Sequence, residues 1–516
     1  MARKLYIFGI GGTGSRVIKA FTFLLASGVK LSKEFDTVIP IIIDPDISNG
    51  DLNRTKTILK LYQEIQNEIH KPYKFFSQKL KTINELTDNS SDVNPEYYHF
   101  KLEGVEDNTF GEYIGFNSLS SNFKDEKDDK SFIKLLYSDK NLQSKLDVGF
   151  KGHPNMGTVV LNQFTTSENF NNFANTFADG DVIFIINSIF GGTGAAGYPL
   201  LLKNLRSNNK DIPRIDKIRI APIGAFTMLP YFALDNKDEI DAESFEQKTV
   251  SAIDYYNRTI LKQNQIDIQY FIGNKGNTNF EEYSVGGVGQ KNRAHFFELV
   301  GALSIFNFTK HITDVIENNE DNEYQRSNTK VREFGINEFN ENGIIFQNLD
   351  TESRELFAFH LTKLKLFSEY LDKRLYKALG KARWTKGKGK FMQLIKAQKN
   401  KYSPLDKEYF NSPEYKNQVK NFLNFFEEWL SEMESNNPAF APFNEIKDDN
   451  AFDIIVGNEL SDKKGFEIVD TINNELIEEQ DIRNTNDLKH STLIKLFDKS
   501  LDRALKENNI LTKKQN

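Results

Sequence analysis

The chain has 516 residues, a length that predicts about three domains of ordinary size. It carries 66 basic and 73 acidic side chains, and its net charge of −7 argues against an extended nucleic-acid footprint or docking on anionic lipid. The absence of cysteine excludes disulfides, thiolate metal sites and cysteine nucleophiles, and without an HExxH pattern we expect no metal centre built from protein ligands.

The N-terminal region does not predict a membrane segment. No apolar stretch reaches the roughly 20 residues that are needed to cross a bilayer. Leu5–Phe8 and Phe21–Leu25 are apolar, but glycines, Arg16 and Lys19 separate them, so they form no signal-peptide core. We therefore expect a cytoplasmic protein.

The first 45 residues predict a strand, a loop, a helix and a second strand. Leu5–Phe8 is a short buried strand, Gly9–Ser15 a tight glycine loop, and the apolar residues from Val17 to Leu25 recur at helical spacing. Val38–Ile43 is a second strand that ends at Asp44. Strands that are apolar throughout and are joined by a helix indicate a parallel sheet covered on both faces.

Residues 51–148 have a different composition. They are polar, with charged or turn-rich stretches at Thr87–Pro95 and Asn122–Lys130. We interpret them as a largely helical insertion. The strand pattern resumes near residue 149.

A second glycine loop follows the insertion. Phe164–Phe177 predicts a helix, Val182–Ile186 a strand, and Phe190–Gly197 a glycine loop that opens a short helix ending near Leu205. Further on we expect strands at Ile218–Ile223 and Ile268–Ile272 and a helix at Phe245–Leu261. Both glycine loops thus follow a strand and open a helix.

The segment Ala294–Phe306 is apolar nearly all round. A helix of this kind is buried on most sides, so we expect it to run through the middle of the protein from about Asn292.

The last third of the chain, after a polar linker at Glu317–Lys330, is dominated by helical periodicity. Apolar stripes run over Tyr415–Met433 and Leu493–Ala504, and two short strands are expected at Gly343–Phe346 and Phe452–Val456. The predicted domains are therefore 1–310, which contains the insertion at about 51–148, and a mainly helical 331–516.

The glycine loops are the strongest chemical signal in the sequence. A loop between a strand and a helix presents backbone N–H groups and a helix N-terminus to an anion, and glycine allows phosphate oxygens to approach the backbone. Two such loops on neighbouring strands can hold one polyphosphate from two sides. Neither loop contains the GK[ST] of a Walker A motif, which excludes ordinary P-loop chemistry.

The motifs resemble those of the tubulin/FtsZ superfamily. Gly191–Gly197 resembles the GGGTGTG signature loop, Gly9–Gly14 the first phosphate loop, and Gly152–Gly157 the Asn-Pro-x-x-Gly loop near the γ-phosphate. The apolar helix from Asn292 matches the central helix, whose first residues contact guanine in that family. The resemblance covers about 1–50 and 149–310 and is closest to divergent bacterial tubulin-like proteins.

This resemblance implies a Rossmann-like α/β GTPase domain with a parallel sheet and a central helix, GTP and Mg²⁺ as cofactors, and head-to-tail self-association into filaments. The residues that it places around the nucleotide are Gly11, Gly12, Thr13, Gly14 and Ser15 on one side of the phosphates, Gly191, Gly192, Thr193 and Gly194 on the other, Asp44 near the ribose or metal-bound water, Asn155 and Gly157 near the γ-phosphate, and Asn292 near the base. Several of them also have a structural interpretation: Ser15 and Asn292 as helix caps, Asp44 as a strand end, and Asn155 with Gly157 as a turn.

The acidic loop that serves hydrolysis in the family is not reproduced. Asp314 and Glu317 are the only nearby carboxylates, without the family's spacing, and both also fit a solvated helix face. They are weak catalytic candidates that would act on a neighbouring subunit, so we expect slow hydrolysis or none.

Two alternatives remain at this point. The ThiF and ubiquitin-activating class shares GxGGxGS (Gly9–Ser15), Asp-x-Asp (Asp44 and Asp46) and a segment like Asp51–Arg54, and it uses ATP to adenylate a carboxylate. That match spans about 1–55 and leaves the second glycine loop unexplained. The other alternative is a scaffold with a degenerate nucleotide fold, in which the insertion and the C-terminal region bind protein partners.

Overall fold

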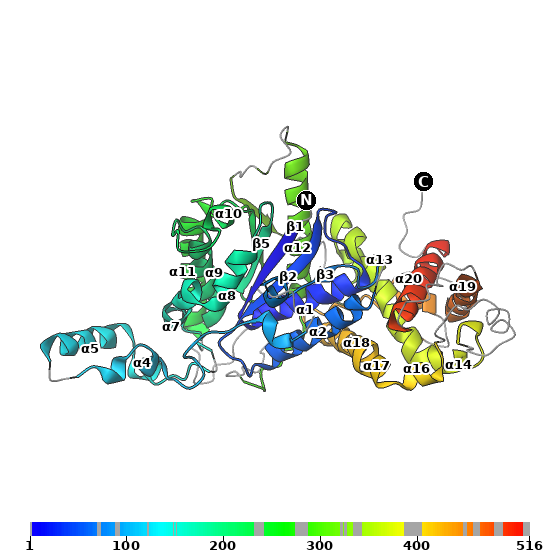
Figure 1. Cartoon of the computed structure of the whole chain (residues 1–516), viewed down its shortest axis with the longest axis horizontal. Helices are drawn as coiled ribbons and strands as arrows, with labels where there is room; N and C mark the ends of the chain where they lie inside the picture. Colours follow the sequence, from blue (N-terminus) through cyan, green and yellow to red (C-terminus); the bar gives the residue numbers. More distant parts are fainter. Residues whose placement is uncertain are drawn as a thin grey trace.

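A computed structural model describes most of the chain (Figure 1). The described residues are 3–69, 74–87, 93–120, 123–147, 149–150, 152–231, 242–273, 287–319, 324, 328–333, 343–385, 405–446, 451–457, 465–478 and 489–508. Within them, no helix is long and apolar enough to cross a membrane.

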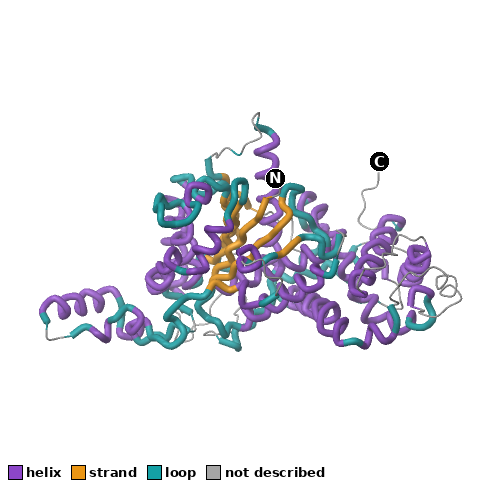
Figure 2. The backbone as a smooth tube through the Cα atoms, in the orientation of Figure 1, coloured by secondary structure: helices purple, strands orange, loops and turns teal. Residues whose placement is uncertain are grey.

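A parallel β-sheet forms the centre of the protein (Figure 2). Its order is β3-β2-β1-β5-β6-β7-β8, with β4 also paired to β2, and every paired neighbour is parallel. The strands are β1 (Arg3–Ile10), β2 (Phe35–Ile43), β3 (Lys79–Leu80), β4 (His99–Phe100), β5 (Val182–Ser188), β6 (Ile223–Met228), β7 (Ile268–Ile272) and β8 (Lys330–Glu333). The expected α/β fold with a parallel sheet is confirmed.

Helices cover both faces of the sheet, as the apolar strands predicted. Side chains of β1 alternate between two cores, with Leu5 and Ile7 in one and Tyr6 and Phe8 in the other. The first core lies under α1 (Gly11–Ser27), α2 (Gly50–Asn67) and α12 (Phe296–Glu317), and the second under α3 (Ile83–Thr87), α7 (Pro154–Leu161), α8 (Glu168–Thr176), α9 (Gly192–Leu205), α10 (Ile215–Ile218) and α11 (Ala242–Tyr256).

The central helix α12 is longer than predicted and starts later. It begins at Phe296 with His295 as its N-cap, so Asn292 precedes the helix and does not cap it. It has 22 residues, about 33 Å of helix, and packs against α1. Its last turns contain Asp314 and Glu317, which therefore lie on a helix.

Three predicted strands are wrong. In the segment expected as a strand at Ile218–Ile223, Ile218 ends the short helix α10, a turn follows, and the strand β6 starts only at Ile223. Gly343–Phe346 and Phe452–Val456 form isolated bridges and 3₁₀ turns. Each of these runs is short and apolar, a pattern that does not distinguish a strand from another buried segment.

Only the second half of the predicted insertion at about 51–148 forms an arm, because its first half supplies α2, β3, α3 and β4 to the sheet and its covering helices. The arm contains α4 (Phe110–Tyr113), α5 (Lys124–Leu136) and α6 (Asp139–Leu142), and α5 extends away from the body of the protein (Figure 1).

The helices of the last third of the chain extend from beside the sheet to the end of the molecule opposite α5 (Figure 1). They are α13 (Thr351–Glu369), α14 (Leu375–Ala378), α16 (Lys407–Asn411), α17 (Pro413–Tyr415), α18 (Asn421–Glu434), α19 (Gly465–Glu478) and α20 (Lys489–Glu507).

Candidate functional site

The two glycine loops meet at the carboxyl ends of neighbouring strands. Strands β1 and β5 pair directly, and each runs into a glycine-rich turn that opens a helix. A Cβ on Gly11, whose φ is +69°, would lie 3.5 Å from Cβ of Thr193 and 3.8 Å from the backbone N of Gly194. The geometry therefore brings the first and second loops into contact, as a shared phosphate site requires.

Both helices that start at these loops have open N-termini. The N-cap residues are Ile10 for α1 and Gly191 for α9, and neither makes a side-chain capping hydrogen bond. The first N–H groups of an α-helix have no partner within the helix, so each loop presents free donors and the positive end of a helix dipole. This is the arrangement that binds phosphate.

Other glycines in the loops serve close packing. A Cβ on Gly14 would lie 2.2 Å from the carbonyl carbon of Gly9, and one on Gly194 would lie 2.7 Å from the carbonyl oxygen of Ser188. Gly192 and Gly157 likewise allow the second loop and α7 to touch, because a Cβ on Gly157 would lie 3.0 Å from the Gly192 carbonyl oxygen. These positions hold the loops against the strands and against α7.

Gly12 is the loop glycine with room for a side chain toward the site. A Cβ there would meet nothing closer than Nη1 of Arg16 at 3.8 Å and Nδ2 of Asn49 at 4.0 Å. By contrast, the Ser15 hydroxyl is buried and lies 3.4 Å from the Gly11 carbonyl oxygen within the same helix. Ser15 therefore does not cap α1.

Asp44 follows β2 next to the first loop and is buried. Its Oδ1 accepts a hydrogen bond from the Asp46 N–H, and its own carbonyl oxygen lies 2.7 Å from Nε2 of His99. Burial raises the pKa of Asp44 to about 8, against an ordinary value of 3.8. In the absence of a ligand the side chain is therefore a neutral carboxylic acid at pH 7.

This pKa predicts a pH dependence of stability. Between pH 4 and 8 the unfolded chain has lost the Asp44 proton and the folded chain still holds it, so the free energy of unfolding falls as the pH rises. We expect Asp44→Asn to remove this contribution. The free energy of unfolding of the variant, relative to that of the wild type, should then be a few kcal/mol higher at pH 8 than at pH 5 when no nucleotide is bound. Denaturant midpoints of both proteins at the two pH values test this, and parallel pH profiles would contradict it.

A polar wall stands beside the first loop. Asn49 caps α2, accepting from the N–H groups of Asp51 and Leu52, and its Nδ2 donates to Oε1 of Gln290 at 2.9 Å. Asn292 donates its backbone and side-chain N–H groups to Oδ2 of Asp51 at 3.2 and 3.0 Å. The structure thus places Asn292 near the first loop, with Asp51 as its hydrogen-bond partner.

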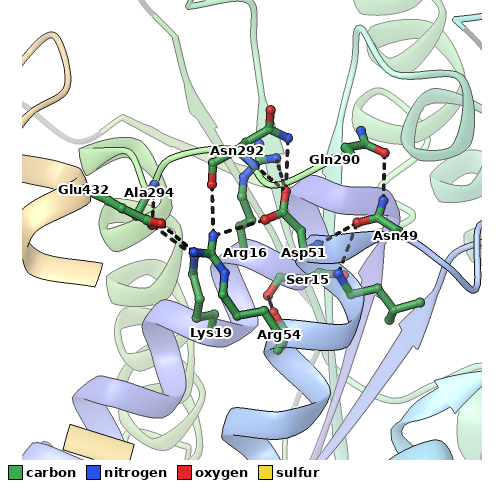
Figure 3. A network of polar contacts seen from close by, with 12 residues as sticks. Ser15, Arg16, Lys19, Asn49, Asp51, Arg54, Gln290, Asn292, Ala294 and Glu432 are labelled. Carbon is green, nitrogen blue, oxygen red and sulfur yellow. Dashed lines mark hydrogen bonds and ion pairs between the residues drawn. The ribbon is translucent and has the colours of Figure 1, made fainter. Parts of the chain in front are cut away.

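Behind this wall lies a buried ion network (Figure 3). Its cations are Arg16, Lys19 and Arg54, and its carboxylates are Asp51, Glu298 and Glu432. Arg16 lies 2.5 Å from Glu298 and 3.3 Å from Asp51, and Arg54 lies 2.5 Å from Glu432. Burial opposes the charge of Arg16, but the carboxylates outweigh it and raise its pKa further.

The network joins the helices that cover the sheet to the C-terminal helices. Glu432 belongs to α18, and it also accepts a hydrogen bond of 2.8 Å from the Ala294 N–H just before α12. These partners could not be predicted from the sequence, because Arg16 and Glu298 are 282 residues apart. One signal was present: Arg16 and Lys19 are charged residues in an otherwise apolar or small helix, and such charges need buried partners.

Asp314 and Glu317 do not join this site. Asp314 is about 27 Å further along the axis of α12 than Phe296, and its side chain is exposed. Glu317 is paired with Lys33 at 2.9 Å. Within one copy of the chain, neither carboxylate can reach the glycine loops.

Asn155 also lies apart from the first loop. It is exposed in the first turn of α7 and lines a cavity of about 760 Å³ between α7, α9 and α11. Ala195 and Ala196 of the second loop's helix line the same cavity, but no residue of the first loop does. The cavity therefore lies on the side of the second loop, since Phe190, Ala195 and Ala196 all belong to Phe190–Gly197.

No protein-family model matches the chain, and no curated protein sequence matches it. Several solved structures are similar in part, and two of them are CetZ proteins. CetZ2 from Haloferax volcanii, solved as a GTPγS-bound protofilament, is 12% identical with a TM-score of 0.28 and matches 59% of this chain and 58% of its own. CetZ from Methanosaeta thermophila is 14% identical with a TM-score of 0.24 and matches 63% of this chain and 57% of its own.

This chain therefore spans less than two thirds of either CetZ chain. Because both TM-scores are below 0.5, the case for function rests on the residues and geometry of this chain. The resemblance to the tubulin/FtsZ superfamily is therefore carried by the motifs of the sequence, and the parallel sheet and the long helix α12 are the parts of the fold that it predicted.

Proposed function

We propose that this protein binds GTP between its two glycine loops and associates head to tail as tubulin-like proteins do. The observation that carries the proposal is the contact of two uncapped helix N-termini across Gly11 and Thr193. Each supplies free backbone donors, so together they suit the several oxygens of a polyphosphate. The choice of guanine rests on the resemblance of the motifs to the superfamily.

The residues around the loops also fit a magnesium ion. Mg²⁺ in nucleotide sites is held mainly by phosphate oxygens and water, with one or two protein oxygens. Asp44 and the hydroxyl groups of Thr13 and Thr193 are the oxygens available here, and among the described residues no group of three or more His, Asp or Glu side chains could hold a metal by itself. The ion would neutralise phosphate charge.

The proposed filament gives Asp314 and Glu317 their only route to a nucleotide. They lie at the end of α12 remote from the glycine loops, which is where head-to-tail stacking would bring the next subunit's site. The Lys33–Glu317 pair and the missing family spacing support slow hydrolysis or none.

The test is to identify the nucleotide that the purified native protein releases on denaturation. We expect a guanine nucleotide in near-stoichiometric amount, and GTP in excess over GDP if hydrolysis is slow. An adenine nucleotide would contradict the guanine assignment and favour the adenylating alternative. If no nucleotide is released and none binds when GTP and Mg²⁺ are added, the proposal fails.

A further inference from the structure

The arm helix α5 exposes an apolar face that no residue of the described part of the chain buries. No residue of α5 is buried, and the side chains of Phe132, Leu135 and Leu136 are 61%, 83% and 56% exposed. They are three and four residues apart, so they form one stripe on the helix. Exposed stripes of large apolar side chains are typical of protein–protein contact sites.

Acidic side chains continue this stripe toward the start of α5. Asp128 and Asp129 precede Phe132 by four and three residues, and Asp125 precedes it by seven, so all three lie near the apolar stripe. Within the described part of the chain, none of the three aspartates has an ion pair. The first half of α5, Lys124–Asp129, holds four acidic residues against two lysines. The free face of the arm is thus apolar at one end and acidic at the other.

The apolar surface extends from the arm onto the body. Leu136 and Tyr255 of α11 both line the cavity of about 760 Å³, and Tyr255 is itself 51% exposed. The acidic residues Asp and Glu are absent from the lining of this cavity. A segment with apolar side chains for the stripe and the cavity, and with basic residues for the acidic end of α5, would therefore match the arm.

One segment of this chain has that composition. Residues 386–401 contain six lysines and no acidic residue, around the apolar side chains of Phe391, Met392, Leu394 and Ile395. The lysines are Lys386, Lys388, Lys390, Lys396, Lys399 and Lys401. We infer that α5 of one copy is a docking site for residues 386–401 of a second copy.

The arrangement of the molecule favours contact between copies. The described neighbours of the segment, Arg383–Thr385 and α16, lie at the opposite end of the molecule from α5 (Figure 1). Because the elements on both sides of the segment lie at that end, the arm of a second copy is favoured over the arm of the same copy. The contact goes beyond the proposed function, since it uses neither the glycine loops nor the far end of α12.

Reciprocal charge reversal tests this inference on the full chain without nucleotide. Variant A carries Asp125→Lys, Asp128→Lys and Asp129→Lys, and variant B carries Lys386→Glu, Lys388→Glu and Lys390→Glu. We expect the wild type to self-associate at low ionic strength in sedimentation velocity, and each variant alone to associate at least tenfold more weakly. An equimolar mixture should regain association, because the arm of A then meets the segment of B and the reverse.

Apolar contact is tested separately. Leu135→Ser should weaken self-association, whereas Ile220→Ser, which changes a side chain 63% exposed elsewhere, should not. Recovery in the mixture also excludes misfolding as the cause, since unfolded variants cannot restore each other. A monomeric wild type, unchanged association of A and B, or no recovery on mixing would each overturn the inference. Because nucleotide is absent throughout, these results do not depend on GTP binding.

Discussion

Replacing Gly12 by glutamate is expected to abolish nucleotide binding and to leave the protein folded. The position is in the first turn of α1, and a Cβ there has no neighbour closer than 3.8 Å. A carboxylate in this place would occupy the space beside the loop and repel phosphate, by roughly 4 kcal/mol for like charges 4 Å apart near a surface. We expect affinity for GTP to fall at least 100-fold in isothermal titration calorimetry.

The free energy of unfolding of the Gly12→Glu variant should not fall together with its affinity for GTP. Glutamate has a higher helix propensity than glycine, and an acidic side chain near a helix N-terminus is favourable. Gly12→Ala and Gly12→Gln are the matched controls, because the first adds only a methyl group and the second has the size of glutamate without its charge. Wild-type affinity in the glutamate variant would show that the first loop does not hold phosphate.

The structure also shows why a large substitution of Gly192 is a poorer probe. A Cβ at Gly192 would lie 2.9 Å from Cβ of Phe150 and 3.1 Å from the backbone N of Gly152. Steric pressure on that packing would disturb the fold together with the site. A substitution of Gly12 tests nucleotide binding without a steric clash that would disturb the fold.

The sequence was sufficient for those parts of the fold that local patterns determine. The strands β1, β2, β5 and β7 were predictable because each is a continuous apolar run next to a turn or a glycine loop. Both glycine loops were visible for the same reason, and the structure brings them together. Whether they bind phosphate is still a prediction.

The elements that were missed depend on contacts between distant residues. The start of β6 is one example: the Ile223 N–H donates to Asp267 at 2.7 Å, and Ile223 pairs with Ile183. The apolar residues around Ile223 allow the strand to start at several positions, and the contacts with Asp267 and Ile183 determine which of them is the first residue of β6. The same holds for α12, whose first turn is fixed by the His295 cap and by the carbonyl oxygen of Asn437 near its ring.

The buried ion network was the largest omission in the candidate site. His295 and Glu298 are one turn apart at the start of α12, but His295 faces Asn437, and Glu298 pairs with Arg16. A charged residue in an apolar segment of the sequence indicates that it needs an oppositely charged partner when buried, but the sequence does not identify that partner. In this protein the partners come from α1, α2, α12 and α18, so only the folded chain reveals them.

Removing Glu298 is expected to be the most destabilising single change in this network. The buried part of the network holds three cations and three carboxylates, with the half-exposed Glu428 as a further partner of Arg54, and Glu298→Ala removes the carboxylate nearest to the buried Arg16. Breaking a buried pair in this way typically costs about 3–5 kcal/mol. Lys19 adds to this cost, because its ammonium group has no hydrogen-bond partner among the described residues and depends on nearby carboxylates for its charge.

Thermal unfolding of Glu298→Ala, of Arg16→Met and of the double variant Arg16→Met/Glu298→Leu tests the network. The double variant should lose less stability than the two single changes added together, because it removes the charges as a pair. Glu352→Ala is the control, since it breaks the exposed Lys310–Glu352 pair and should cost at most about 1 kcal/mol. If Glu298→Ala were as mild as this control, Glu298 would not be compensating the buried cations. The connection of α18 to the glycine-loop helix would then depend on apolar packing, such as that of Phe23 against Trp429.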